Sequence, residues 1–265
     1  MVWIYNYQLW AMALMFGGLS LGTTWLGILF FEKTGVRAWL HRHEKTARNL
    51  GQTFSNFFVL FGLLVGLLVV SSYERFNEAG DNVDKEATLL VSLYHDFKMY
   101  PAPFSNLLRR KMFEYAEVTI EQDWKVQNEG GYPLAGTQII NETRHILLSF
   151  EPKDKRQELL LAEDIKQFNL LVETRRLRLA SIDQGLPDIL WWILLFGVLI
   201  NSILLALQEM EALPHMLISS VLALTLGSIV FLIAELDYPF LGQVSVGPES
   251  IARMHDHIKK HAEQE

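Results

Sequence analysis

A long apolar stretch that runs directly into a charged helical pattern constrains this sequence more than any other feature. From Thr53 to Tyr73 the chain carries no charged residue, and about twenty such residues are enough to cross the roughly 30 Å hydrocarbon core of a bilayer. No glycine or proline separates this uncharged stretch from the charged residues that follow it, beginning with Glu74 and Arg75. Because nothing there ends a helix, the stretch predicts one helix that leaves a membrane and continues into an extramembrane domain.

Three further apolar segments predict membrane helices. They cover about residues 9–31, 189–207 and 213–234, so that the chain has four predicted spans together with the one at 53–73. The first lysine or arginine is Lys33, and a cleavable signal peptide needs a basic start. The first apolar segment is therefore interpreted as a retained span.

The spans divide the chain into membrane and extramembrane regions. We expect an all-α integral membrane protein in which residues 1–73 and 187–235 form the membrane region. Residues 74–186 then form a helical extramembrane domain, and residues 236–265 form a polar C-terminal tail. Helical spacing of apolar residues, interrupted by proline and glycine, predicts the helices of the domain: one continuing from the second span, then about 104–127, 136–150 and 155–182. A short amphipathic helix is expected near Val36, Trp39 and Leu40.

Composition excludes several classes of function. The net charge of −7 and the pI near 5.6 argue against nucleic acid as a partner, which needs a clustered basic face. The absence of cysteine removes thiol catalysis and cysteine metal sites. No nucleophile elbow, phosphate loop or zincin motif is present, so we expect neither an enzyme nor a cofactor. His257 and His261 share a helical face, but a third ligand is not evident, and we expect no metal site there or at His41 and His43.

Polar groups inside the spans are few and uncharged. The absence of a mid-span Asp, Glu, Lys or Arg argues against a proton pump. At the end of the fourth span, Glu235 and Asp237 are candidates to pair with Arg75 or Arg178, or else are solvated carboxylates. Two small-xxx-small pairs, Gly18 with Gly22 and Gly62 with Gly66, suit close helix packing.

A set of motifs in fixed order gives the chain a family resemblance. The second span exits through Ser71-Ser72-Tyr73-Glu74-Arg75-Phe76, and the fourth ends in Glu235-Leu236-Asp237-Tyr238-Pro239-Phe240. Between them lie Asn82-Val83, Glu86-Ala87, Glu121-Gln122-Asp123-Trp124 and Arg175-Arg176-Leu177-Arg178. Over residues 49–253 this pattern resembles the bestrophin-like family of uncharacterised bacterial membrane proteins. More distantly, it is similar to the bestrophin anion channels.

The bestrophin resemblance implies a function and a site. It implies a homo-oligomer, a pentamer in bestrophins, that conducts small inorganic anions through a pore lined by the second span. The pore neck would be formed by Val59, Leu63 and Leu67, which lie four residues apart on one helical face. Tyr73, Arg75, Phe76, Asp237, Pro239 and Phe240 would form a structural motif where the helices leave the membrane. The acidic run that binds calcium in animal bestrophins does not follow Pro239-Phe240, so no calcium site is implied.

Other interpretations of the same residues stay open. The aliphatic face at Val59, Leu63 and Leu67 is also typical of core packing or lipid contact, as on any apolar helix. The protein is alternatively a non-conducting scaffold or accessory subunit with partner membrane subunits. The side of the domain is also open. The basic loop at residues 33–48 favours an external domain by the positive-inside rule, whereas the resemblance favours a cytoplasmic domain in a bacterial inner membrane.

Overall fold

The computed structural model describes residue 5, residues 7–42 and residues 44–262, and all of their regular elements are helical. The all-α prediction is therefore confirmed. The chain divides into two compact units, one formed by residues 1–74 and 185–237 and the other by residues 75–184 and 238–265. Among the described residues, four helices are long and apolar enough to cross a membrane, and they correspond to the four predicted spans, the third of which ends one residue earlier than predicted, at Ala206.

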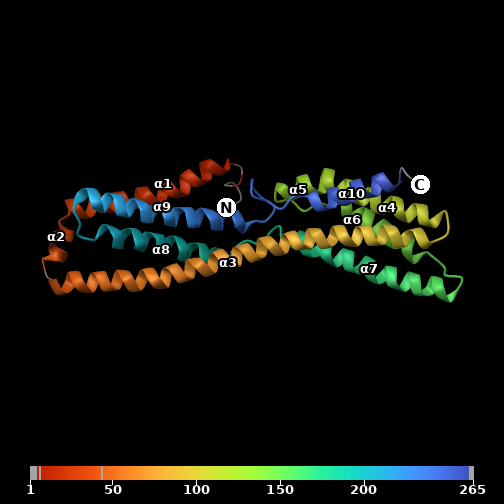
Figure 1. Cartoon of the computed structure of the whole chain (residues 1–265), viewed down its shortest axis with the longest axis horizontal. Coiled ribbons are helices and arrows are strands. Elements are labelled where there is room, and N and C mark those ends of the chain that lie inside the picture. The colour runs from red at the N-terminus through yellow and green to blue at the C-terminus, as the bar shows by residue number, and fades with distance from the viewer. Residues whose placement is uncertain (1–4, 6, 43, 263–265) are drawn as a thin grey trace. The chain divides into compact units, whose positions relative to one another are not determined.

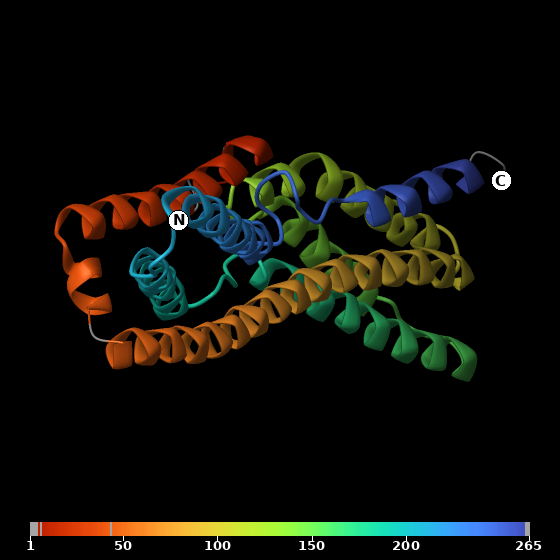
Figure 2. The same ribbon diagram turned by 60° about the vertical axis from the view of Figure 1, so that its left-hand side comes forward.

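The first unit, called the membrane unit below, contains these four helices. It consists of α1 (Leu9–Lys33), the short α2 (Val36–His41), the first part of α3 (Glu44–Asp96), α8 (Asp188–Ala206) and α9 (Ala212–Asp237). In both views α1 and α9 run side by side (Figures 1 and 2), and α1 also packs against α8. The predicted amphipathic helix corresponds to α2.

Close backbone approach and small polar residues hold α1 to its neighbours. A Cβ atom on Gly227 of α9 would lie 2.9 Å from both the Gly17 Cα atom and the Phe16 carbonyl oxygen of α1. Farther along α1, the Thr24 hydroxyl donates to the Ser202 hydroxyl of α8 over 3.2 Å. The small-xxx-small pair predicted at Gly18 and Gly22 has open space beside both glycines. The close crossing inside the chain therefore uses the neighbouring Gly17.

Helix α3 is the long helix that the sequence predicts, but it begins earlier than expected. It runs without interruption from Glu44 to Asp96, whereas the apolar pattern predicts a start near Thr53. Residues 44–52 are too polar to be recognised as a span, yet they contain no proline, and Gln52 donates to Asn56 over 3.0 Å across one helical turn. A 3₁₀ turn at Phe97–Met99 and the prolines at 101 and 103 follow its end.

The second unit is a helical domain around one hydrophobic core. It combines the last part of α3 with α4 (Phe104–Val118), η3 (Thr119–Asp123), α5 (Trp124–Asn128), α6 (Ala135–Leu148), α7 (Lys155–Ala180) and α10 (Glu249–Ala262). The predicted single helix over 104–127 is divided by the π-helical turn η3. The predicted tail contains α10, which buries Ile251 and Ile258 in this core.

Candidate functional site

The candidate pore-neck residues share an exposed face of α3. The side chains of Val59, Leu63 and Leu67 are 68%, 63% and 61% exposed. On the opposite face of the same helix, Phe61 and Val65 are buried in the core of the membrane unit. Residues four apart lie on one face of a helix, so packing inside the chain leaves a continuous aliphatic strip uncovered. Such a strip needs a pore, lipid or another subunit beside it.

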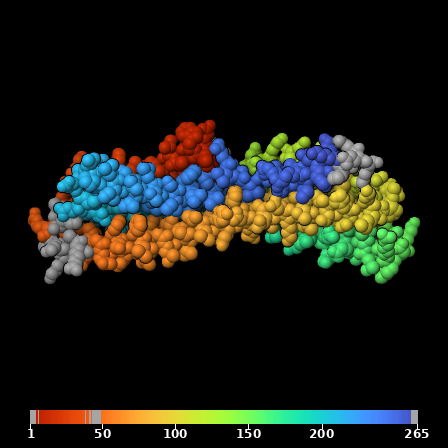
Figure 3. Space-filling view, viewed as in Figure 1, coloured from red at the N-terminus to blue at the C-terminus, as the bar shows by residue number. Residues whose placement is uncertain are grey.

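An apolar cavity lies next to this strip, between α3 and α9. Its volume is about 480 Å³, and its walls include Gly62 and Gly66 of α3 together with Leu226 and Ile229 of α9. Both glycines have nothing within 4 Å of the position that a Cβ atom would take. Figure 3 shows α9 and this part of α3 next to each other on one face of the membrane unit. The cavity is wide enough to admit side chains of another helix.

Asp237, the last residue of α9, is a buried hydrogen-bond acceptor within the membrane unit. Its Oδ1 atom accepts from the Leu186 backbone N–H, and its Oδ2 atom accepts from the Trp191 indole Nε1 over 3.0 Å. These bonds attach the end of α9 to the connection that enters α8.

Pro239 and Phe240 of the exit motif belong to the helical domain. The Pro239 carbonyl accepts from the Val246 N–H over 2.8 Å. Phe240 is buried and meets the Trp124 ring edge-on, with ring centroids 5.9 Å apart. These contacts close the loop that joins α9 to α10 and place it on the domain core.

The other exit residues are less enclosed. Tyr73 is 54% exposed, whereas Arg75 and Phe76 are partly buried along α3. Arg178 was considered as a partner for Glu235 or Asp237. In the structure it forms an ion pair with Glu86 of α3 instead.

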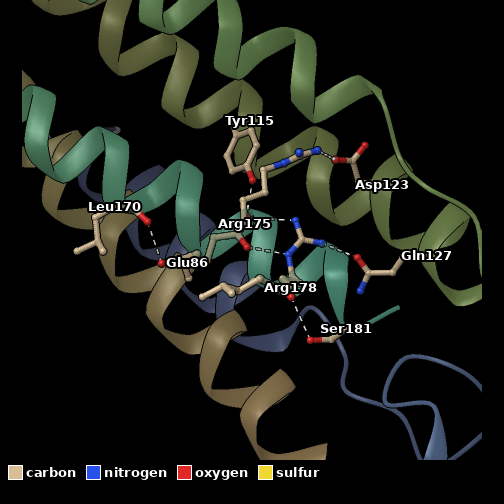
Figure 4. A network of polar contacts seen from close by, with 10 residues as sticks. Glu86, Tyr115, Asp123, Gln127, Leu170, Arg175, Arg178 and Ser181 are labelled. Atoms are coloured by element: carbon tan, nitrogen blue, oxygen red, sulfur yellow. Dashed lines mark hydrogen bonds and ion pairs between the residues drawn. The ribbon is translucent and has the colours of Figure 1, made fainter. Parts of the chain in front are cut away.

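A buried polar network in the helical domain gathers residues from four elements (Figure 4). Arg178 of α7 is fully buried. Its Nε atom donates to Glu86 over 2.7 Å, and its Nη1 atom donates to the Gln127 side chain over 2.6 Å. The Tyr115 hydroxyl donates to the other oxygen of Glu86, and the guanidinium lies 5.0 Å from the centre of the Trp124 ring. A buried charge is stable only when it is paired and hydrogen-bonded in this way.

The π-helical turn η3 supplies a second ion pair to the same region. Its last residue, Asp123, accepts from Arg175 of α7 over 3.2 Å and from the Gly136 N–H over 3.2 Å. A Cβ atom on Gly136 would clash with the Oδ2 atom of Asp123, so only glycine leaves room for the carboxylate. Single π turns inside α-helices are frequent at functional sites, and here the turn ends at the residue that meets Arg175.

The network fixes the protonation of its members. Burial raises the pKa of Tyr115, and the Glu86 carboxylate raises it further. Burial lowers the pKa of Arg178, but Glu86 and Tyr115 outweigh it, so the pKa remains above its usual value. The arginine is therefore always charged, the tyrosine remains a donor, and the network ties α3, α4, α5 and α7 together.

The network was not predicted as a site, although its charged residues belong to the motifs that carry the resemblance: Glu86, Asp123, Arg175 and Arg178. Glu86 lies three residues after Val83 and four before Leu90, both buried, so it occupies the apolar face of α3. A charged residue on such a face is the signal that identifies it. The partner could not be found in this way, because Glu86 and Arg178 are 92 residues apart.

Potential metal ligands do not cluster in the described part of the chain. No group of three or more His, Cys, Asp or Glu side chains there is arranged to hold a metal ion. The side chains of His41, His43 and His261 lie outside the described part of the chain. Neither of the histidine pairs noted in the sequence is therefore described in full.

A buried carboxyl group, Asp164 of α7, gives the helical domain a pH dependence. Burial raises its pKa to about 6; the Tyr100 hydroxyl lowers it, whereas Asp96 and Glu163 raise it. The folded state thus binds a proton that the unfolded state has already lost, so stability falls as the pH rises from about 4 to 6. We expect Asp164→Asn to raise stability at pH 7.5 by about 1–3 kcal/mol.

Thermal unfolding followed at pH 4.5 and 7.5 measures this effect. The Asn variant should gain at pH 7.5 and gain little at pH 4.5. Asp154 caps α7 by accepting from the Gln157 N–H and is a control, since asparagine caps a helix about as well and Asp154→Asn should bring no gain. An equal change in stability on Asp164→Asn at both pH values would show that the titration of Asp164 does not affect stability.

Comparison with known proteins places the chain in a family. The family model of the bestrophin-like domain matches residues 9–251. The chain belongs to the bestrophin-like family. No curated protein matched the sequence.

Solved structures confirm that the fold is that of bestrophin homologues. Two single-mutation variants of a bacterial bestrophin homologue from Klebsiella pneumoniae superpose with TM-scores of 0.70 and 0.68, at 13% and 16% identity. In both cases 94% of this chain and 98% of the other are covered. A further structure of the Klebsiella homologue gives a TM-score of 0.66 at 15% identity, covering 93% and 96%. Together with the four apolar helices, family and fold describe a multi-pass membrane protein.

Proposed function

We propose that this protein is an oligomeric membrane channel in which α3 lines the pore and Val59, Leu63 and Leu67 form an apolar neck. The observation that carries the proposal is the uncovered aliphatic strip on α3, which the packing of a single subunit leaves exposed. A ring of such side chains can gate a pore by excluding water. Membership of the bestrophin-like family and the bestrophin fold support the same interpretation.

The finer features of the proposal follow the family resemblance. They are a pentameric assembly, small inorganic anions as the permeating species, and a bacterial inner membrane with the helical domain on the cytoplasmic side. An uncharged pore segment is compatible with anions, because it has no fixed carboxylate that would repel them. Family and fold likewise favour a channel over an enzyme.

Replacing Leu63 with threonine tests the neck. Threonine keeps a branched side chain but adds a hydroxyl that stabilises water in the constriction, so chloride flux into proteoliposomes should rise about five- to tenfold, corresponding to a barrier lower by about 1–1.4 kcal/mol. Leu217→Thr on α9 is a matched control, because Leu217 is 60% exposed but lies on another helix. A folded protein with no flux in either form, or equal changes in both variants, would contradict the neck.

A second function is favoured by the cavity beside Gly62 and Gly66. Its apolar walls and the open space at both glycines suit the packing of a foreign membrane helix, as in an accessory subunit of a larger complex. Gentle purification from native membranes distinguishes the two functions. A ring of identical subunits supports the channel, whereas a stoichiometric foreign subunit supports the accessory role.

A further inference from the structure

A second cavity of the membrane unit lies where α1, α2 and the start of α9 meet. It has a volume of about 130 Å³, several times the roughly 10–15 Å³ that one water molecule needs. Helix α1 ends at Lys33 and α9 begins at Ala212, so the cavity lies at the end of two membrane helices. It therefore lies at the depth of lipid headgroups. Its walls include Trp25, Leu29, Glu32, Arg37, Met210 and His215.

Both signs of charge line this cavity. Glu32 of α1 provides a carboxylate and Arg37 of α2 a guanidinium. Arg37 is held in place by a 2.8 Å bond from its Nη2 atom to the Met210 carbonyl. A guanidinium has five N–H donors, so this single bond leaves capacity for a phosphate. Trp25 adds an indole, which is typical of the membrane interface.

His215 supplies a buried acceptor to the same cavity. The residue is 2% exposed, and its Nε2 atom lies 2.9 Å from the Leu205 carbonyl oxygen. Because a carbonyl can only accept, Nε2 carries the proton, and Nδ1 of the neutral ring is then an acceptor. Nδ1 is buried and has no hydrogen-bond partner among the described residues. A buried acceptor without a donor is unfavourable, and because Nδ1 is enclosed, a donor in the cavity that the ring lines reaches it only after a small shift of the ring.

We infer that this cavity binds the headgroup of a phospholipid that carries a primary ammonium, such as phosphatidylethanolamine. The ammonium offers three N–H donors, which suit Glu32 and His215 Nδ1, and the phosphate suits Arg37. The lipid's acyl chains would follow Leu29, which is 55% exposed beside the cavity. A choline headgroup has no N–H to donate, and a phosphatidylglycerol headgroup has no positive charge for Glu32. Lipid binding at this cavity would not depend on whether the protein conducts ions.

Native mass spectrometry of the full-length protein tests the headgroup preference. The purified protein is delipidated and offered phosphatidylethanolamine, phosphatidylcholine and phosphatidylglycerol with identical acyl chains. We expect phosphatidylethanolamine to be retained about tenfold over phosphatidylcholine, the size of effect expected when a buried hydrogen bond to a charged donor is made or lost. Stepwise N-methylation of the ethanolamine should weaken retention at each step.

Two variants and one control connect the preference to this cavity. Glu32→Gln removes the negative charge of an exposed residue at little risk to folding, and His215→Leu removes the acceptor; each should reduce the preference to near that for phosphatidylcholine. Ser228→Ala, at an exposed position of α9 outside the cavity, should leave it unchanged. Equal retention of the three lipids by the unaltered protein overturns the inference. Binding of soluble phosphoethanolamine without selective lipid retention overturns the lipid assignment.

Discussion

Replacing Arg178 with methionine should lower the stability of the helical domain by about 3–5 kcal/mol, the cost expected when one partner of a buried ion pair is removed. Methionine fills much of the same volume, but Glu86 loses the cation with which it is paired and Gln127 loses its donor. The expected shift in the midpoint of thermal unfolding in detergent is roughly 6–20 °C downward.

The same helix offers a matched control for this change. Arg176 lies two residues from Arg178 but is exposed, so Arg176→Met should shift the midpoint by no more than about 0.5 kcal/mol in equivalent stability. The double variant Glu86→Leu with Arg178→Met removes both charges and should recover much of the loss. A single Arg178→Met variant as stable as the Arg176→Met control would contradict the view that the network holds the domain together.

The continuation of α3 beyond its apolar segment could be predicted from the sequence, whereas its early start at Glu44 and the π turn that follows α4 could not. An uncharged run followed by charged residues without glycine or proline is a local signal, and α3 follows it to Asp96. The turn η3 interrupts a region whose helical spacing is regular over 104–127. Its position is explained by a contact between distant segments, since Asp123 meets Arg175, 52 residues away.

The candidate site also has some features that could be predicted from the sequence and others that could not. The four-residue spacing predicts a shared helical face for Val59, Leu63 and Leu67. All three side chains are exposed, which agrees with this prediction. Their place in a pore depends on contacts between subunits, which no single-chain pattern specifies, and it stays a prediction. The ion pair of Glu86 with Arg178 could not be predicted, because the position of Glu86 on an apolar face indicates a buried charge but does not identify a partner 92 residues away.

Replacing Gly227 with valine should separate α1 from α9 and destabilise the membrane unit. The new Cβ atom would lie 2.9 Å from the Gly17 Cα atom and the Phe16 carbonyl oxygen, and backbone atoms cannot move aside as a side chain can. Close approach at glycine is a main source of packing between membrane helices, so we expect a loss of about 1–3 kcal/mol or more, measured as a lower midpoint of thermal unfolding in detergent.

Gly18 and Gly22 provide the control for this crossing, because both lie on α1 and have nothing within 4 Å of the position that a Cβ atom would take. Valine at either position should be tolerated by an isolated subunit, at the small cost of a β-branched residue in a helix. If Gly18→Val or Gly22→Val instead matched Gly227→Val in the isolated subunit, the crossing at Gly17 would not be what holds α1 in place. If they weakened only the assembled oligomer, these two glycines would belong to a contact between subunits, and the small-xxx-small pair of α1 would have its partner outside its own chain.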